Sequence, residues 1–245
     1  MTRQSSLRLT GDERHKAIIK AVKKVFARNG FDGTTTRQLA ASAGISEALL
    51  FKHFPNKEAL YDAVIESSVD EPGFAEIVSN RFTDAKPSAS MLIMMVHFMI
   101  THFVQRDDEE ESIMDRLAVQ SLLADGEFLK RTIKKVSDTW IHKFEECVDA
   151  AQEEGALRET PVRKDLRFWF THHIAFSLLL HLDLPEDPAL NYKASTDRLI
   201  EQAVWFALLG IGMKEDWIRK LYNPKALALL ERQDFFCSIW LVNTY

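Results

Sequence analysis

The sequence predicts an all-α protein, on three observations. Strand signals are nearly absent, with few alternating β-branched runs and no Asn-Gly hairpin. Apolar residues recur instead with the helical period of 3.6 over long segments. The nine glycines and seven prolines fall mostly between those segments. A chain of 245 residues with 46% hydrophobic content is long enough to bury the cores of one large or two modest domains.

Four helices are expected in the first 70 residues. Thr10 and Glu13 have the spacing of a capping box, in which each side chain satisfies a backbone N–H at the helix start. Pro55 forces a boundary, because the residue before a proline disfavours helical geometry. The expected N-caps are Thr10, Thr35, Ser46 and Asn56, and the expected ends are Gly30, Gly44, Pro55 and about Ser68.

The remaining periodic segments are longer. Residues 126–154 have the clearest apolar stripe, which runs from Leu129 through Phe144 to Ala151. We expect helices near residues 72–83, 88–105, 110–124, 126–154, 163–183, 195–212, 215–222 and 224–233. Residues 234–245 are too apolar to be left in water and are expected to cover either the C-terminal domain or a partner subunit.

Charge is distributed unevenly along the chain. Residues 1–60 hold eleven Lys and Arg against five Asp and Glu, a net charge of +6, which leaves −11 for the rest of a chain whose total is −5. A basic end on an acidic body places a polyanion-binding surface at the N-terminus. The alternative is a basic helix face that water simply solvates.

Residues 35–54 fit a helix-turn-helix. Two short helices that cross steeply need a small residue at the crossing and a turn residue that tolerates positive φ, and Ala40 and Gly44 supply them. Ile45 and Leu50 then fill the wedge between the helices. In this motif the second helix enters the DNA major groove with its N-terminal residues on the base edges.

The run FDGTTTRQLAASAGIS, followed by EALLFKHFPNKEAL, closely resembles the N-terminal domain of the tetracycline-repressor (TetR) family. The order of threonine cap, small residue, turn glycine, aromatic-rich helix and Phe-Pro-x-Lys-Glu makes this motif specific, and the match covers residues 12 to about 65. The resemblance implies a repressor that binds a palindromic operator as a homodimer and is released by a small, largely apolar effector. It implies a flexible arm at 1–11, a DNA-binding domain at 12–70 and an all-helical ligand-binding and dimerisation domain at 71–245. Activation in place of repression is left open.

The resemblance also assigns roles to residues. Thr35, Thr36 and Lys57 would contact phosphates, and the third helix would face the groove. Arg37 is either a solvated helix charge or a further phosphate contact. The expected DNA-binding residues are Thr35, Thr36, Arg37, Ser46, Glu47, Ala48, Leu49, Lys52, His53 and Lys57.

Three residues depart from the family pattern. The family usually has tyrosine at the position of Phe51, so a hydroxyl contact to phosphate should be missing. It often has a basic residue at the position of Glu47 and a small polar one at that of Leu49. Glu47 would either accept from cytosine N4 or, as an acid in the first turn, stabilise the helix dipole, and Leu49 would touch a thymine methyl.

Two further sites are expected in the C-terminal domain. The segment 163–183 is apolar nearly all round, so it lies either in a monomer core or, as the family resemblance implies, in a dimer interface. Methionine and aromatic residues near 88–105 suit either ordinary packing or an adaptable ligand pocket. The expected interface residues are Phe170, Ile174, Leu178, Val204 and Leu208, and the expected pocket residues are Met95, Phe98, His102, Trp140 and Phe144.

Other classes of protein find little support. No phosphate loop, nucleophile elbow or HExxH motif is present. We therefore expect that the protein is not an enzyme and binds no cofactor. The alternative is a small helical enzyme, or a ligand-binding module with a vestigial DNA-binding domain. Adjacent His172 and His173 cannot share a helix face, and no metal site is expected. Cys147 and Cys237 lie far apart in the sequence, and no secretory signal is visible. The apolar stretches are too short to span a bilayer. These observations favour a cytoplasmic location.

Overall fold

The computed structural model describes residues 10–70, 85–105, 109–182 and 188–230. Within these ranges the regular secondary structure is helical, apart from an isolated antiparallel bridge between Leu157 and Met213. The predicted all-α class is thereby confirmed. The chain divides into two compact units: unit 1 comprises residues 1–76 and 108–136, and unit 2 comprises residues 77–107 and 137–245.

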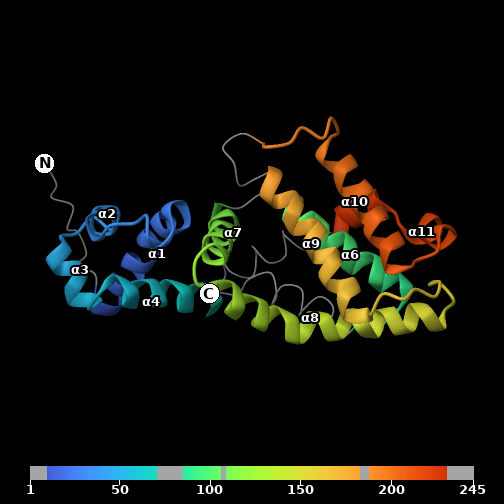
Figure 1. Ribbon diagram of the computed structural model, residues 1–245, viewed down its shortest axis with the longest axis horizontal. Coiled ribbons are helices and arrows are strands. Elements are labelled where there is room, and N and C mark those ends of the chain that lie inside the picture. Colours follow the sequence, from blue (N-terminus) through green and yellow to red (C-terminus); the bar gives the residue numbers. More distant parts are fainter. Residues whose placement is uncertain (1–9, 71–84, 106–108, 183–187, 231–245) are drawn as a thin grey trace, which may run out of the picture. The chain divides into compact units, whose positions relative to one another are not determined.

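Unit 1 contains the four predicted N-terminal helices and one later helix (Figure 1). The bounds are α1 Gly11–Asn29, α2 Thr36–Ser42, α3 Glu47–His53, α4 Lys57–Asp70 and α7 Glu109–Leu122. A shared core joins them, in which α1 contributes Ile18, Val22 and Phe26 at helical spacing. Leu39 of α2 and Leu50 of α3 are buried in the same core, so the two short helices are held by packing as well as by their own hydrogen bonds.

The helix starts lie where the capping residues predict them. Thr10 and Thr35 each form a full capping box, with Glu13 and Gln38 respectively. The Ser46 hydroxyl accepts a hydrogen bond from the Leu49 N–H at 3.2 Å, and Asn56 Oδ1 accepts one from the Ala59 N–H at 2.7 Å. Each such cap contributes about 1 kcal/mol to helix stability, which is why the sequence locates these boundaries so closely.

Helix α7 packs on α1, and the sequence did not predict this contact. Ile113 and Leu117 are buried in the core of unit 1, and Phe128, near the start of α8, lies there too. The predicted boundary assigned everything after residue 70 to a second domain, whereas the contacts group residues 108–136 with the N-terminal helices. An amphipathic pattern shows that a helix has a buried face, but not which neighbour covers that face.

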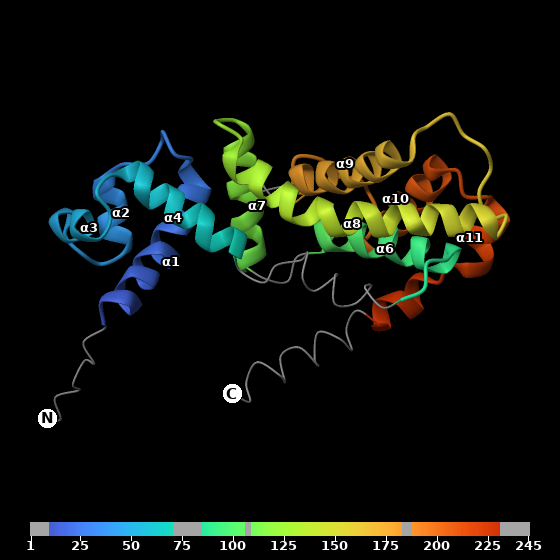
Figure 2. The same cartoon turned by 90° about the horizontal axis from the view of Figure 1, so that it is seen from below.

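Unit 2 is built around three helices that contact one another in pairs. Helices α6 (Ala89–Val104), α9 (Lys164–Leu182) and α10 (Thr196–Ile211) lie side by side in both views (Figures 1 and 2). Helix α8 (Glu127–Glu153) continues from unit 1 into unit 2, and α11 (Glu215–Leu221) contacts α6 and α10. Residues 224–230 are also helical.

The predicted helices of unit 2 agree with these bounds to within one or two residues, up to residue 222. The segments expected to be helical at 72–83 and to cover a surface at 234–245 lie outside the described residues. In the described part of the chain, no helix combines the length and the apolarity needed to cross a bilayer.

Candidate functional site

Helices α2 and α3 form the predicted helix-turn-helix. Ala40 is buried on α2, and its carbonyl accepts a hydrogen bond from the Ile45 N–H at 3.0 Å across the turn. Gly44 lies between them with φ +65°, a left-handed conformation that costs glycine little and other residues about 1 kcal/mol or more. Leu50 is buried beneath α3, so the opposite side of α3 is left facing outward.

The residues predicted to bind DNA all retain some exposure to solvent. Six of them are exposed, namely Thr35, Arg37, Ser46, Glu47, Ala48 and Lys52. Four are partly buried, namely Thr36, Leu49, His53 and Lys57. The helix-turn-helix and the start of α4 therefore expose hydroxyl, carboxylate, ammonium and apolar groups to solvent. This is the mixture that reading a base edge and holding a phosphate require.

Two predicted phosphate contacts are already engaged within the chain. The Thr35 hydroxyl donates to Gln38 Oε1 at 3.0 Å as part of the capping box of α2. The Thr36 hydroxyl donates to Glu47 Oε2 at 2.8 Å, across eleven residues and from α2 to α3. Each hydroxyl has a single proton, so donation to a phosphate requires the internal bond to open.

Aromatic rings position the basic groups at this face. The Lys57 ammonium lies 4.1 Å from the centroid of the Phe31 ring, a cation–π contact that holds it at the start of α4. His15 of α1 stacks on Phe54 at 4.3 Å and lies 6.2 Å from the His53 ring. His15 is not evident from the sequence, because nothing in a linear pattern brings α1 beside the end of α3. Phe51, where the family usually has tyrosine, is 43% exposed.

The five residues predicted to line a ligand pocket lie in or near the interior of unit 2. Met95, Trp140 and Phe144 are buried, and Phe98 and His102 are partly buried. Phe144 meets Phe168 edge to face at 5.4 Å, so α8 and α9 are joined there by aromatic packing. A hollow of about 460 Å³ lies elsewhere, along α9, and none of the five lines it.

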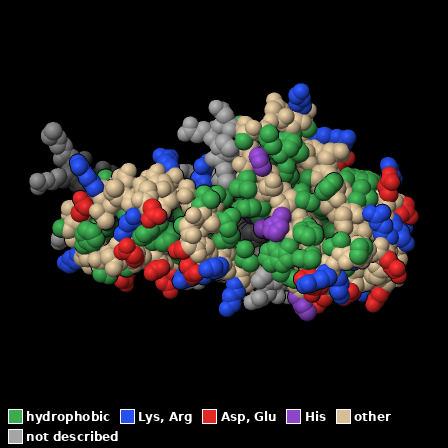
Figure 3. Space-filling view, in the orientation of Figure 1, with side chains coloured by type: hydrophobic (Ala, Val, Ile, Leu, Met, Phe, Trp, Pro, Cys, Tyr) green, Lys and Arg blue, Asp and Glu red, His purple; other side chains and the backbone are tan. Residues whose placement is uncertain are grey.

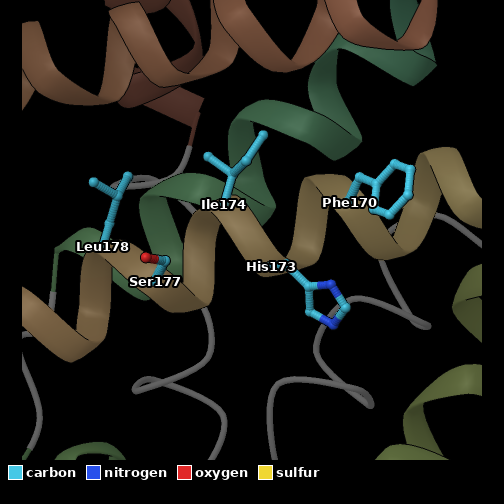
Figure 4. Close-up of a pocket in the computed structure, with 5 residues that line it drawn as sticks. All are labelled: Phe170, His173, Ile174, Ser177 and Leu178. Carbon is cyan, nitrogen blue, oxygen red and sulfur yellow. The ribbon is translucent and has the colours of Figure 1, made fainter.

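That hollow follows one helix. Phe170, Ile174 and Leu178 project from the same side of α9, and His173 projects from the other (Figure 4). Ser177 completes the lining. Hydrophobic side chains also gather around histidines over α9 in the space-filling view (Figure 3). The surface of unit 2 is therefore apolar and hollowed along α9.

The predicted interface residues divide by burial. Val204 and Leu208 are 0% exposed within the chain and form part of the unit's own core, so these two are the least accessible of the five to a second copy. The outward face of α10 carries Phe206, which is 69% exposed, and Leu209. On α9, Phe170 is 52% exposed, Ile174 is partly buried and Leu178 is nearly covered.

Two histidines of unit 2, the buried His97 and the partly buried His172, have a lowered pKa. Burial lowers the pKa of His97 to about 4, and its Nδ1 lies 3.1 Å from the Tyr222 hydroxyl. Burial, with a smaller effect from His173, also lowers the pKa of His172 to about 4. The His172 ring stacks on Phe176 at 5.9 Å and meets Phe103 edge to face at 5.3 Å. Among the described residues no group of three or more His, Cys, Asp or Glu is placed to hold a metal ion.

His172 is expected to make the protein less stable in acid. Its pKa is lower in the folded than in the unfolded chain, so the unfolded chain binds more protons between pH 4 and 6.5, and stability falls as the pH drops through that window. Between pH 7.5 and pH 5.0 this amounts to about 2 kcal/mol for one such histidine. His172→Phe, which keeps the aromatic packing, should remove that part of the loss in urea unfolding curves. His142→Phe, at an exposed position of α8, is the control, and an equal loss in the parent and His172→Phe would refute the expectation.

The four N-terminal helices match a known protein family. The model for bacterial regulatory proteins of the tetR family matches residues 18–64. Over 55 residues the chain is 46% identical to the HTH-type transcriptional regulator RutR of Escherichia coli K12, a match that covers 22% of this chain and 26% of RutR. The chain thus spans about a quarter of that relative. The nucleoid occlusion factor SlmA of Vibrio campbellii is 29% identical over 156 residues, which cover 63% of this chain and 72% of SlmA.

Solved structures match over most of the chain. A bacterial regulatory protein of the tetR family from Rhodococcus RHA1 aligns with a TM-score of 0.58 at 18% identity, covering 83% of this chain and 99% of that one. AibR, solved with isovaleryl coenzyme A and operator DNA, aligns with a TM-score of 0.57 at 22% identity, covering 79% and 97%. At these identities the structural likeness establishes the fold, while the family model and the sequence relatives identify the helix-turn-helix. Residues 18–64 thus match the tetR family of bacterial regulatory proteins, and the rest of the chain shares the fold of solved members of that family.

Proposed function

We propose that this protein is a transcriptional repressor that binds a palindromic operator as a homodimer and is released by a small, largely apolar effector. The outward face of α3 is the observation that carries the proposal. Ser46, Glu47, Ala48 and Lys52 are exposed on a helix whose other side is buried through Leu50. A helix of this size fits the major groove, about 12 Å wide, and reads base edges from its first turns.

Charge supports the same orientation on DNA. The net charge of +6 lies within residues 1–60, and the exposed Arg37 and Lys52 lie on the helix-turn-helix itself. Neutralising phosphates releases condensed counterions, which supplies sequence-independent affinity. The acidic remainder of the chain disfavours binding to DNA in any other orientation.

The apolar surface on α9 and α10 supports the homodimer. Phe170, Phe206 and Leu209 are large apolar side chains exposed on two neighbouring helices. Gly210 is exposed beside them, and a Cβ placed there would meet nothing within 4 Å, so a second helix can approach closely. Contacts of this kind repeat under a two-fold axis, and a two-fold dimer matches a palindromic site.

The aromatic lining of unit 2 supports an apolar effector. The rings of Phe103, Trp169 and Phe176 contact His172, and the hollow along α9 is lined mainly by apolar side chains. AibR, which shares the fold, has been solved with an acyl coenzyme A and operator DNA together. We propose that the effector favours a dimer whose recognition helices no longer match successive major grooves, which lie about 34 Å apart.

Selection from a random duplex library tests this function. The purified chain should enrich a palindromic sequence, and fluorescence anisotropy should show at least about a thousandfold tighter binding to that duplex than to mixed-sequence DNA. Small molecules that copurify with the protein, identified by mass spectrometry, should weaken the binding. Failure to enrich any sequence would refute the DNA-binding function, and failure of every bound molecule to alter affinity would refute the release by an effector.

Lys57→Ala should weaken binding to all DNA alike. Loss of one phosphate contact is expected to reduce the slope of log Kd against log salt by about one, with the sequence preference unchanged. Anisotropy titrations at several salt concentrations measure this slope. Lys86→Ala, at an exposed position of unit 2, is the matched control and should leave the slope as in the parent. Equal slopes for Lys57→Ala and the parent would exclude Lys57 from the phosphate contacts.

A further inference from the structure

A hydrogen bond joins Thr36, which can donate to a DNA phosphate, to Glu47, which a DNA phosphate repels. Both lie in first turns, Thr36 on α2 and Glu47 on α3, and the donor-to-acceptor distance is 2.8 Å. Thr36 is a neutral donor that suits a phosphate oxygen. Glu47 carries a negative charge that a phosphate repels. The bond therefore connects a group that favours the DNA backbone to one that opposes it.

The Thr36 hydroxyl cannot serve both acceptors. It has one proton, which the Glu47 carboxylate accepts in the free protein. If the hydroxyl turns to a phosphate, the carboxylate loses this donor at the moment when α3 enters the groove and water is displaced. A carboxylate left without a donor beside phosphates costs free energy, through both repulsion and lost solvation.

Only certain base pairs offset that cost. In the major groove, cytosine N4 presents a donor to which a carboxylate can bind. Adenine N6 is also a donor, but the adjacent N7 acceptor repels a negative charge, and thymine and guanine present acceptors. A carboxylate at this position therefore finds a partner over cytosine and remains without one over most other bases.

We infer, on the basis of the proposed function, that Glu47 is a specificity-determining residue, acting through its bond to Thr36. On non-cognate DNA the Glu47 carboxylate keeps its hydrogen bond to the Thr36 hydroxyl, so the hydroxyl does not reach a phosphate. Where a cytosine amino group donates to the carboxylate instead, the Thr36 hydroxyl is free to donate to a phosphate. Phosphate anchoring by Thr36 is in this way coupled to the base beneath Glu47. The residue works mainly by weakening binding to incorrect sequences, a form of specificity that needs no increase in operator affinity.

Glu47→Gln separates the charge from the hydrogen bond, because an amide oxygen still accepts from Thr36. The variant should bind a mixed-sequence duplex about fivefold more tightly than the parent, the effect of one surface charge at low salt. Selection repeated with it should lose the cytosine preference at one symmetric pair of positions. Glu66→Gln removes the same charge from an exposed position on α4 and should change neither result.

Thr36→Val keeps the charge and removes the donor. It should weaken binding to the selected duplex and leave binding to mixed-sequence DNA nearly unchanged, because Thr36 contacts phosphate only where cytosine releases it. If Glu47 only held α2 against α3, Glu47→Gln would behave as the parent does, and an unchanged mixed-sequence Kd with an unchanged selected sequence would overturn the inference. The parent, assayed in parallel, distinguishes the two failures: a parent that enriches no sequence refutes the proposed function and the inference together.

Discussion

Phe206→Glu is expected to convert the proposed homodimer into a monomer and to reduce affinity for the proposed operator by at least about a hundredfold. Phe206 is 69% exposed within its own chain, so the substitution removes little packing from the protomer. In a two-fold interface each substitution occurs twice, and each places a charge in an apolar contact without a partner. A monomer then meets only one half-site, and the loss of the second half removes several base contacts, each worth about 1–3 kcal/mol.

Sedimentation velocity at micromolar concentration and anisotropy on the selected duplex measure the two effects of this substitution. Leu123→Glu is the matched control, because Leu123 is 79% exposed in unit 1, after α7. The control should remain dimeric. A Phe206→Glu protein that sediments as the parent does would exclude the outward face of α10 from the interface.

Phe26→Ala is expected to destabilise unit 1 by about 3–5 kcal/mol, a large share of the 5–15 kcal/mol that typically holds a domain folded. Phe26 is 0% exposed, meets Tyr61 edge to face at 5.0 Å and lies parallel to Phe31 at 6.3 Å. Phe26 belongs to the same buried core as Leu39 of α2 and Leu50 of α3, so its loss is expected to loosen the support of the recognition helix.

Urea unfolding followed by circular dichroism measures the destabilisation. Phe51→Ala, also in unit 1 but on the exposed side of α3, provides the comparison and should change the free energy of unfolding by no more than about 0.5 kcal/mol. The expectation fails if Phe26→Ala costs less than about 1 kcal/mol.

The helix boundaries could be predicted because they depend on local chemistry. The Thr35 and Gln38 pair determines the start of α2 through bonds made within four residues, and Ser46 does the same for α3. Gly44 is required where the backbone turns to positive φ. Such interactions are visible in a short stretch of sequence, so the helix-turn-helix could be located before its structure was known.

The faces of the apolar helices could not be predicted in the same way. On α10, Val204 and Phe206 are both large and apolar, yet one is buried and the other is exposed. Periodicity distinguishes polar from apolar sides, and it loses that power when both sides are apolar. The choice is made by the packing of α10 on α6 and α9, which depends on contacts between residues far apart in the chain.

The candidate DNA-binding face was predicted as a set of residues but not as a set of contacts. Thr36 and Glu47 were both selected for DNA, eleven positions apart, with no indication that they bind each other. Likewise, the cation–π contact of Lys57 with Phe31 depends on how α4 returns toward the end of α1. Side-chain partners across a turn require the backbone path, which residue types alone do not specify.

The packing of α7 on α1 bears on how the chain folds during synthesis. The core that supports the recognition helix includes Ile113, Leu117 and Phe128, so it is incomplete until the ribosome has passed well beyond the helix-turn-helix. Domains generally fold as units while the chain emerges. The segment that reads DNA is made first, but its hydrophobic support arrives about 60 residues later, after part of unit 2 has already been synthesised.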